Sequence, residues 1–392
     1  MDPVMNPFRP GAGRRPPLLA GRERELAAFD VARRRCEERG EGERPWVIHG
    51  LRGVGKTVLL GELLAQVTSR GWIAAKVEVA AGRPLPQALA HELQRALRTA
   101  TGRHEPGRLR RVLAVFSAFS LTVDPTGGLS VGLDIDPERG TADSGDLALD
   151  LLELFEVLGE SARDLGVGVL VLIDELQEAT GQELRALNTA VHRLGQGLTP
   201  LPVLVIGAGL PSLPPLLAEA TSYAERLYDY RAIGALEEDG ARQALTGPAA
   251  DLDVRWDHSA LQLTLDSARG YPYFLQAAGK HVWDEAVRSP ISVEDAELGV
   301  AAARAEIDDG LYRARWERAT PVQRQLLRAL AQIGGSEPAA VSDLAHALGK
   351  KSARGISVAR DEVLRKGLVY VPERGFLRFS VPGMDDFIAR QD

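Results

Sequence analysis

Eight consecutive residues have the types and spacing of a loop that binds phosphate groups. Residues 50–57 read Gly-Leu-Arg-Gly-Val-Gly-Lys-Thr, which fits the pattern G-x-x-x-x-G-K-[ST]. Gly50 and Gly55 are expected to adopt backbone angles that a Cβ would forbid, so that successive N–H groups turn toward an anion. The pattern predicts that Lys56 brings positive charge to the β- and γ-phosphates of a nucleotide and that the Thr57 hydroxyl holds Mg²⁺.

Two elements must position this loop. The apolar run 46–50 predicts a buried strand before it, and the leucines of 56–70 recur at helical spacing after it. The helix N-terminus then adds its dipole to the phosphate site. This strand–loop–helix frame favours a nucleotide site over an incidental glycine-rich turn. The residues expected to contact the phosphates are Gly50, Arg52, Gly53, Val54, Gly55, Lys56, Thr57 and Val58.

A second set of candidate residues supplies what hydrolysis of a nucleotide requires. Asp174 and Glu175 follow the apolar run 167–173, which is typical of a strand buried on both faces. Ligand chemistry in parallel sheets lies at the carboxyl ends of strands. We therefore expect Asp174 to bind Mg²⁺ and Glu175 to polarise the attacking water, with Lys56 stabilising the charge. An acidic pair that only caps the next helix is the alternative interpretation.

The chain around these motifs alternates strands with helices. Further strands are expected at 73–79 and 203–206, with helices at 84–100, 146–165 and 182–194. This order predicts an α/β fold with a three-layer parallel sheet. Residues 117–137 interrupt the order, because two alternating apolar segments flank a Gly-Gly turn. We expect a β-hairpin insertion there, which serves either as a structural flap or as a partner-binding element.

The second half of the chain reads as helices followed by a small mixed unit. From 318 onward, three helices at 321–333, 340–348 and 353–366 precede strands at 368–371 and 376–379, which is typical of a winged helix-turn-helix. The expected division is a flexible N-terminus at 1–17, a nucleotide-binding core at 18–235, a helical lid and linker helix at 236–317, and the winged helix at 318–392.

Together these motifs resemble those of the AAA+ and STAND ATPases, especially the origin-recognition-like and archaeal-ATPase-like branch. The two motifs at 50–57 and 172–177 carry the resemblance. Residues 19–26 are similar to the family's GRExEL segment, which lies against adenine, and 270–276 to its Gly-x-Pro lid motif. The resemblance covers the chain from residue 18 onward and implies a P-loop ATPase that uses ATP and Mg²⁺. It adds three residues to the expected nucleotide site, namely Gly21, Arg22 and Pro272.

Two departures from this family bear on the rate of hydrolysis. The family often carries a polar side chain at the end of the strand after the Asp-Glu strand, whereas this chain reads Val-Ile-Gly-Ala-Gly at 205–209. Ser212 lies farther on and is a weak substitute. Arg269 precedes the lid motif instead of lying within its helix. These differences favour slow turnover, or a switch cycle instead of a motor.

Arg226 precedes the expected last strand of the core sheet. In relatives of this family an arginine at that place reaches the γ-phosphate of a neighbouring subunit. As such a finger, Arg226 would add positive charge to the transition state and would require a homo-oligomer. The alternative is a surface or intramolecular salt-bridging arginine.

Composition restricts the remaining classes of function. The net charge of −7 argues against non-specific nucleic-acid binding by the whole surface. The only cysteine is Cys36, so neither an intramolecular disulfide nor a cysteine metal cluster can form. No apolar run has the length of a membrane span, and residues 1–17 lack an apolar signal core and are expected to fray. We expect a soluble cytoplasmic protein without a membrane partner.

The C-terminal unit differs from the whole chain in charge. Residues 318–392 contain 12 Lys and Arg against eight Asp and Glu, a balance of +4. This charge is compatible with contacts to duplex DNA, and equally with protein docking or autoinhibition. Three functions therefore stay open: an ATP-driven molecular switch, a DNA-binding regulator or DNA-loading factor, and a protein-binding scaffold or defence-type sensor.

Overall fold

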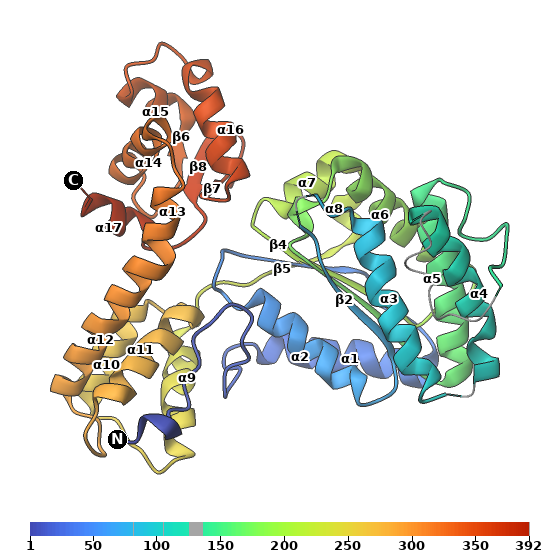
Figure 1. Cartoon of the computed structure of the whole chain (residues 1–392), viewed down its shortest axis with the longest axis horizontal. Helices are drawn as coiled ribbons and strands as arrows, with labels where there is room; N and C mark the ends of the chain where they lie inside the picture. The colour runs from blue at the N-terminus through green and yellow to red at the C-terminus, as the bar shows by residue number, and fades with distance from the viewer. Residues whose placement is uncertain (81, 105, 125–135, 392) are drawn as a thin grey trace.

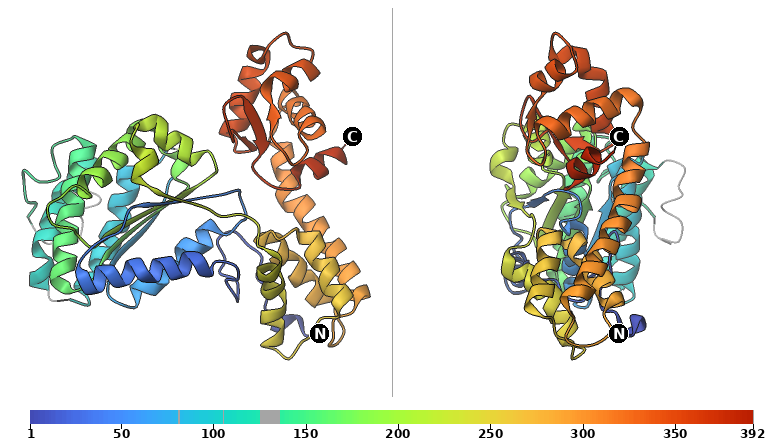
Figure 2. Two further views of the ribbon diagram at one scale, coloured as in Figure 1. Left: turned by 180° about the vertical axis from the view of Figure 1, so that it is seen from behind. Right: turned by 90° about the vertical axis from the view of Figure 1, so that its left-hand side faces the viewer.

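The computed structural model describes residues 1–80, 82–104, 106–124 and 136–391. Figure 1 shows three bodies along the chain: an α/β core, a helical lid and a small C-terminal unit. Viewed from behind, the C-terminal unit stands at the end of the long helix that leaves the lid (Figure 2). The nucleotide motifs of the sequence belong to the core, at the side that faces the other two bodies.

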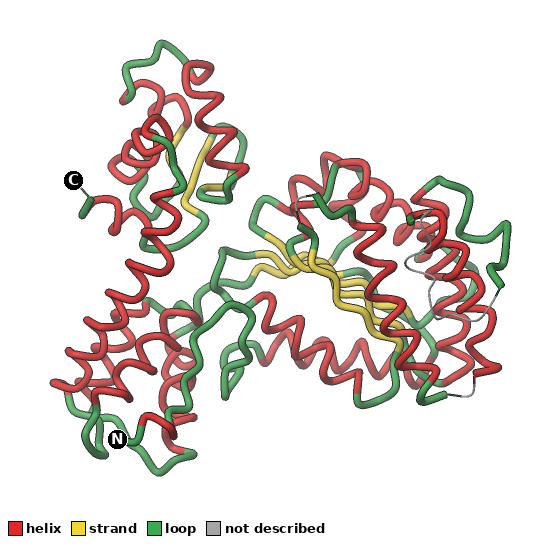
Figure 3. Tube along the Cα trace, viewed as in Figure 1, coloured by secondary structure: helices red, strands yellow, loops and turns green. Residues whose placement is uncertain are grey.

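The core contains one parallel sheet of five strands in the order β2-β3-β4-β1-β5. The strands β3 and β4 are buried along their whole length, as their uninterrupted apolar sequences predicted. Figure 3 shows the sheet between two layers of helices. The expected three-layer α/β fold is confirmed. The strands are β1 (Trp46–His49), β2 (Ile73–Glu78), β3 (Val169–Asp174), β4 (Val203–Gly209) and β5 (Asp229–Ala232).

Helices cover both faces of this sheet. The helices α1 (Glu23–Arg39) and α2 (Lys56–Thr68) lie on one face, with the leucines of α2 at 59, 60 and 63 fully buried against the strands (Figure 1). The other layer contains α3 (Leu85–Thr101), α4 (Pro106–Val123), α5 (Leu147–Leu165), α6 (Gly181–Leu194), α7 (Leu213–Ala220) and α8 (Ala224–Leu227).

The helix α4 corrects the predicted β-hairpin insertion. The first strand of that hairpin was expected within 117–123, but these residues continue the helix that begins at Pro106. Phe116 and Phe119 are both fully buried, three residues apart, and so lie on one helical face. Burial of this face against α3 and α5 outweighs the short alternating pattern. The remainder of the predicted hairpin, 125–135, lies outside the described residues.

Four helices form the lid, and the last continues toward the C-terminus. They are α9 (Glu238–Ala250), α10 (His258–Ala268), α11 (Pro272–Glu285) and α12 (Val293–Ile307). A π-helical turn at Asp308–Arg313 and the short α13 (Ala314–Glu317) extend α12 into the C-terminal unit. The linker helix that the sequence predicted is therefore present, with a change of helical pitch before its end.

The C-terminal unit has its own hydrophobic core, which includes Trp316, Leu327 and Phe387. The three helices and two strands that the sequence predicted are present. A short strand, β6, completes an antiparallel sheet in the order β6-β8-β7, and a final helix was not predicted. The elements are α14 (Pro321–Ile333), β6 (Ala339–Ala340), α15 (Val341–Ala347), α16 (Ser357–Arg365), β7 (Val369–Tyr370), β8 (Phe376–Phe379) and α17 (Met384–Ala389).

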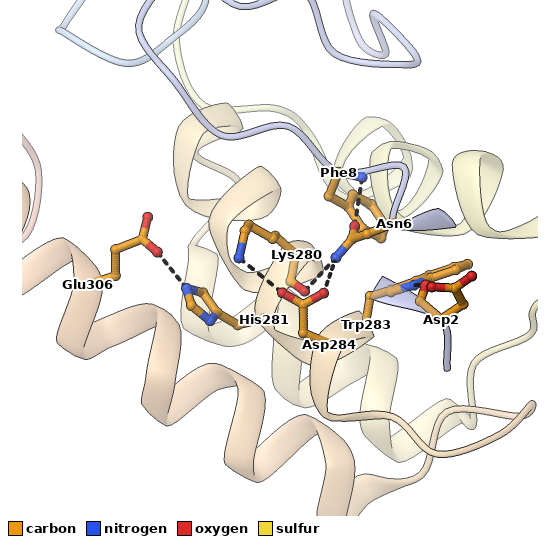
Figure 4. A network of polar contacts seen from close by, with 8 residues as sticks. All are labelled: Asp2, Asn6, Phe8, Lys280, His281, Trp283, Asp284 and Glu306. Carbon is orange, nitrogen blue, oxygen red and sulfur yellow. Dashed lines mark hydrogen bonds and ion pairs between the residues drawn. The ribbon is translucent and has the colours of Figure 1, made fainter. Parts of the chain in front are cut away.

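Residues 1–17, which we name the N-terminal strap, begin on the lid and continue to the core instead of fraying. Asn6 donates from Nδ2 to the Lys280 carbonyl at 2.9 Å and to the Asp284 carboxylate at 2.7 Å (Figure 4). Phe8 is 3% exposed and packs edge-on against Trp283. The expectation of a frayed segment was therefore wrong, because a single buried aromatic residue and a bonded amide fix the strap to α11.

None of the helices that the structure describes combines the length and the apolarity that crossing a lipid bilayer requires.

Candidate nucleotide site

The phosphate loop joins β1 to α2, and its glycines have different roles. Gly53 and Gly55 have φ of +85° and +93°, and a Cβ on Gly55 would point into open space. These two residues supply the left-handed backbone that turns N–H groups toward a ligand. Gly50 was expected to do the same, but its φ is ordinary. A Cβ there would lie 2.1 Å from the Ile233 carbonyl oxygen, so close approach of the chain after β5 requires this glycine.

Lys56 is the first residue of α2 and is held against its own loop. Its Nζ donates to the carbonyls of Gly50 at 2.8 Å and Leu51 at 2.9 Å. Burial lowers the pKa of Lys56 to about 8, although the carboxylates of Glu175 and Asp174 oppose this shift. A phosphate in the site would favour the charged ammonium and replace the loop carbonyls as its partner.

The acidic pair lies at the end of β3, as predicted. Asp174 is 2% exposed, and its Oδ1 accepts the Glu175 N–H at 3.0 Å. Glu175 has φ of +52°, a left-handed conformation that is unfavourable for a residue with a Cβ and typical of functional sites. Its carboxylate lies 3.7 Å from Nη1 of Arg52 in the phosphate loop. The structure thus brings together two motifs that are far apart in the sequence.

A cavity of about 360 Å³ lies in front of the loop. Its wall comes from the loop, the strap, the start of α11 and the C-terminal unit, the last through Val381 and Pro382. Glu175 is the single acidic residue among the lining residues that the structure describes, against six basic ones, in a chain whose net charge is −7. This local excess of positive charge suits a polyanionic ligand. The basic residues are Arg9, Arg14, Arg22, Arg52, Lys56 and Arg315.

Most of the other loop residues expected at the phosphates belong to the cavity wall. Arg52, Gly53, Val54, Gly55, Thr57 and Val58 all line the cavity with Lys56. Thr57 lines the cavity, whereas Asp174 is buried at the end of β3 and is not part of the cavity wall. The Thr57 hydroxyl and the Asp174 carboxylate are the oxygen donors that a Mg²⁺ ion would take here. This donor set fits the ion, which usually keeps several waters and takes few protein ligands beside phosphate oxygens. No cluster of three or more metal-ligating side chains occurs in the described ranges.

The three residues added by family resemblance behave differently from one another. Pro272 begins α11 and lines the cavity. Arg22 also lines it but is 7% exposed, and its Nη2 donates to the carbonyls of Val54 at 3.0 Å and Gly234 at 2.6 Å. It therefore fixes the loop through the backbone. Gly21 has φ of +68° and packs against Leu236.

Arg226 is distant from the phosphate loop of its own chain. It lies in α8, just before the first residue of β5. The first residues of β5 and β1 pair with each other, whereas the phosphate loop follows the last residue of β1, at the opposite edge of the sheet. Its side chain is exposed and its carbonyl accepts Nη2 of Arg44 at 2.8 Å. Any action on a phosphate must therefore involve a second molecule. Arg269 is also outside the cavity wall and pairs with Asp386 at 3.1 Å.

Gln177 is a residue whose role the sequence did not reveal. Its Oε1 accepts the Leu210 N–H at 3.0 Å, at the end of β4, and its Nε2 donates to the Glu175 carboxylate. A Cβ on Gly209 would lie 2.4 Å from the same Oε1. The apolar end of β4 thus gains a polar group from the turn that follows the neighbouring strand β3. The signal was the glycine at 209, which leaves room for this side chain.

Comparisons with known proteins agree with this geometry. Residues 18–206 match the family model described as AAA ATPase domain, and residues 309–388 match a domain of unknown function (DUF8462). The Walker-type ATPase PABY2304 of Pyrococcus abyssi is 16% identical with a TM-score of 0.62, and the match covers 98% of this chain and 99% of that one.

The ORC2 protein of Aeropyrum pernix, solved as ADPNP–ADP complexes, is 16% identical with a TM-score of 0.54 over 97% of this chain and 96% of that one. No curated protein matches this sequence. Residues 18–206 are therefore similar in sequence to AAA ATPase domains, and the fold of the whole chain is shared with these two archaeal proteins.

Proposed function

We propose that this protein is a slow, Mg²⁺-dependent ATPase that uses its nucleotide state to move the C-terminal unit, a winged helix. One observation carries the coupling. The backbone N–H of Arg52, in the phosphate loop, donates to the Ser380 carbonyl of the C-terminal unit at 3.2 Å. Ser380 is itself fully buried, and its hydroxyl donates to the Gly367 carbonyl at 2.6 Å, so the segment that meets the loop is fixed to its own unit.

The residues that follow Ser380 bring the C-terminal unit to the ligand as well as to the loop. Val381 and Pro382 line the cavity beside Lys56 and Glu175. A ligand in the cavity therefore meets the loop and the C-terminal unit together, and a change in that ligand alters the contacts of both.

The residues of the site have distinct roles in this proposal. Mg²⁺, held by Thr57 and Asp174, would neutralise charge on the transferred phosphoryl group. Lys56 would bind the β- and γ-phosphates, and Glu175 would orient and polarise the attacking water. Gln177 would hold the Glu175 carboxylate in position.

Slow turnover follows from how Glu175 is held. Its carboxylate already accepts a hydrogen bond from Gln177 and lies near Arg52, so two neighbours occupy the group that must orient the water. A water molecule must compete with these partners. Such an arrangement suits a protein that stays in one nucleotide state for long periods.

Two substitutions test the enzymatic part. Lys56→Ala should lower ATP affinity at least about tenfold, because it removes a charged hydrogen-bond donor to phosphate. Glu175→Gln should keep ATP affinity and lower phosphate release by roughly a hundredfold or more. Equilibrium binding of a fluorescent ATP analogue and a phosphate-release assay measure the two effects. Lys351→Ala, an exposed lysine outside the cavity, is the control, and unchanged ATP affinity in Lys56→Ala would refute the proposal.

The coupling is tested by the shape and mass of the Glu175→Gln protein in solution, with and without Mg-ATP. Small-angle scattering should show a change in the radius of gyration when ATP binds. Light scattering in the same samples reports assembly.

If assembly occurs, we propose that Arg226 acts on the nucleotide of the neighbouring molecule, so Arg226→Ala should lower turnover only in the assembled protein. For the coupling itself, identical small-angle scattering curves of the Glu175→Gln protein with and without Mg-ATP would reject the switch.

Contact with duplex DNA is the second candidate function, and it is favoured by the surface before α16. Lys350, Lys351 and Arg354 are exposed and form no ion pair with any residue that the structure describes, whereas Arg360 pairs with Asp361 at 2.8 Å. Unpaired cations at the start of a recognition helix suit phosphate contacts.

This candidate is tested by fluorescence anisotropy of a labelled duplex at increasing salt. Exchange of Lys350, Lys351 and Arg354 for Gln should weaken binding. It should also make the plot of log affinity against log salt concentration less steep, by the amount that about three phosphate contacts contribute. Arg360→Gln, whose charge is already neutralised by Asp361, should change binding little. Absence of binding by the unmodified protein at low salt would reject this function.

A further inference from the structure

Arg315 brings a positive charge from the C-terminal side of the molecule into the nucleotide cavity. It lies in α13, next to Trp316, which is 7% exposed in the core of the C-terminal unit. Arg315 lines the same cavity as Lys56 and Glu175. Its position is therefore tied to the C-terminal unit, although it contributes to the wall in front of the phosphate loop.

The guanidinium of Arg315 has no counter-ion among the described residues. It forms no hydrogen bond or ion pair with any of them, and its Nε is buried without a partner. Burial lowers the pKa of Arg315, and the positive charges of Arg52 and Arg318 lower it further. A partly buried cation without an anion is unfavourable, so the arrangement calls for an anionic ligand.

Arg52 lies in the same cavity wall, and Glu175 is its one acidic neighbour among the described residues of that wall. Its Nε is also buried without a partner, and Nη1 is 3.7 Å from the Glu175 carboxylate, which is too long for a hydrogen bond. Guanidinium groups present paired N–H donors that match the oxygens of a phosphate. Arg52 and Arg315 therefore offer such donors to one ligand.

We propose that Arg52 and Arg315 together form a subsite for the terminal phosphate of a nucleoside triphosphate. This inference rests on the proposed ATPase function and names the group that distinguishes the triphosphate from the diphosphate. In the proposed function Lys56 binds both the β- and the γ-phosphate. The two arginines supply further positive charge, which the terminal phosphate meets and a diphosphate lacks the group to use.

The subsite also gives the switch a direction. The C-terminal unit is joined to the lid side by ion pairs between Arg390 and Asp308 at 2.8 Å and between Arg269 and Asp386 at 3.1 Å. A phosphate between Arg52 and Arg315 holds the C-terminal unit against the loop. Loss of that phosphate restores repulsion between the two guanidinium groups and releases the unit. The triphosphate state is therefore the closed one.

The test measures dissociation constants of Mg-ATP and Mg-ADP by calorimetry, with the full chain in the Glu175→Gln background. Arg315→Gln should weaken ATP binding roughly ten- to a hundredfold, as loss of charge-assisted hydrogen bonds does, and change ADP binding less than about twofold. Arg52→Gln should have the same selectivity. Arg313→Gln is the matched control, because that exposed arginine lies two residues away and pairs with Asp309 at 2.9 Å.

If Arg315 served only to stabilise the fold, its substitution would lower the Tm and affect ATP and ADP binding alike. Since Arg315 forms no bond with any described residue, Arg315→Gln should leave the Tm without nucleotide unchanged or higher. A decrease in Tm of several degrees, equal losses for ATP and ADP, or unchanged ATP affinity would each overturn the subsite. If the parent protein binds neither nucleotide, the proposed function itself fails and the subsite falls with it.

The direction is tested by small-angle scattering of the same samples. The parent protein should have a smaller radius of gyration with Mg-ATP than with Mg-ADP, and Arg315→Gln should give the same value with both. A larger radius with Mg-ATP would overturn the proposed direction.

Discussion

Glu175 depends on a neighbouring side chain as well as on its position at the end of β3. Gln177 connects its carboxylate to the backbone of Leu210, just after the adjacent strand β4. We predict that Gln177→Ala lowers the turnover number roughly ten- to a hundredfold, because the carboxylate proposed to orient the water would lose its fixed position. Nucleotide affinity should stay within about twofold, since Gln177 lies outside the cavity wall.

Phosphate release and calorimetric titration separate these two quantities. Gln262→Ala, in an exposed pair with Asp266 on a lid helix, is the control for loss of a glutamine. A loss of ATP affinity equal to the loss of turnover would contradict a positioning role for Gln177.

Cys36 offers a second prediction at this scale. It is 1% exposed between α1 and the sheet, and burial raises the pKa of its thiol to about 12. The thiolate is the reactive form, so at pH 8 the folded chain should react with a thiol reagent only when α1 opens. The unfolded chain, whose thiol has its ordinary pKa, should react within seconds to minutes. Rapid labelling of the native protein at pH 8 would contradict this structure of the core.

The residues of the site could be predicted from the sequence better than the reasons for them. The roles of Gly55 and Gly53 are local, so the motif was sufficient to place them. Gly50 is required by the Ile233 carbonyl, which is distant in sequence, so its true role could not be predicted. The same holds for Arg315, because nothing in a single arginine near a tryptophan shows that the fold returns it to the phosphate loop.

At the scale of elements, the long hydrophobic patterns predicted the correct strands and helices, whereas the short alternating pattern within 117–123 predicted a strand where the chain is helical. The continuous apolar strands and the helices around them were predicted because each has one buried face over many residues. The alternation at 119, 121 and 123 is too short to distinguish a period of two from the helical period. The burial of Phe116 and Phe119 against α3 and α5 favours the helix, and these tertiary contacts cannot be seen in the sequence alone.

Helix packing in the lid leads to a prediction at this scale. A Cβ on Gly299 of α12 would lie 2.4 Å from the Cα of Val282 in α11. Gly299→Ala should therefore separate the two helices and lower the free energy of unfolding by about 1–3 kcal/mol. Gly61→Ala in α2, where nothing lies within 4 Å of the added methyl, should raise it by about 0.5–1 kcal/mol through helix propensity. Urea denaturation of both variants compares the signs, and a stabilising Gly299→Ala would contradict the close packing.

For the whole molecule, the N-terminal strap connects the lid to the core. Phe8 fixes it to the lid, Arg15 pairs with Glu62 of α2 at 2.7 Å, and residues between them line the cavity. We predict that Phe8→Ala accelerates nucleotide dissociation several-fold, because the strap no longer covers the cavity.

Stopped-flow displacement of a fluorescent nucleotide measures this rate. Val4→Ala, on the same strap but 88% exposed, should leave it unchanged. Equal rates in the Phe8→Ala and parent proteins would show that the strap does not retain the nucleotide.

The shielded thiol of Cys36 has a practical consequence for studying the proposed switch. Because the only native cysteine is unreactive, dyes can be attached selectively to introduced cysteines. Leu198, in the loop after α6 of the α/β body, and Val358 on α16 are highly exposed, at 105% and 74%, and so are suitable positions. A donor and an acceptor at these two places would form a molecular ruler, with which opening and closing can be followed in single molecules during one cycle of hydrolysis.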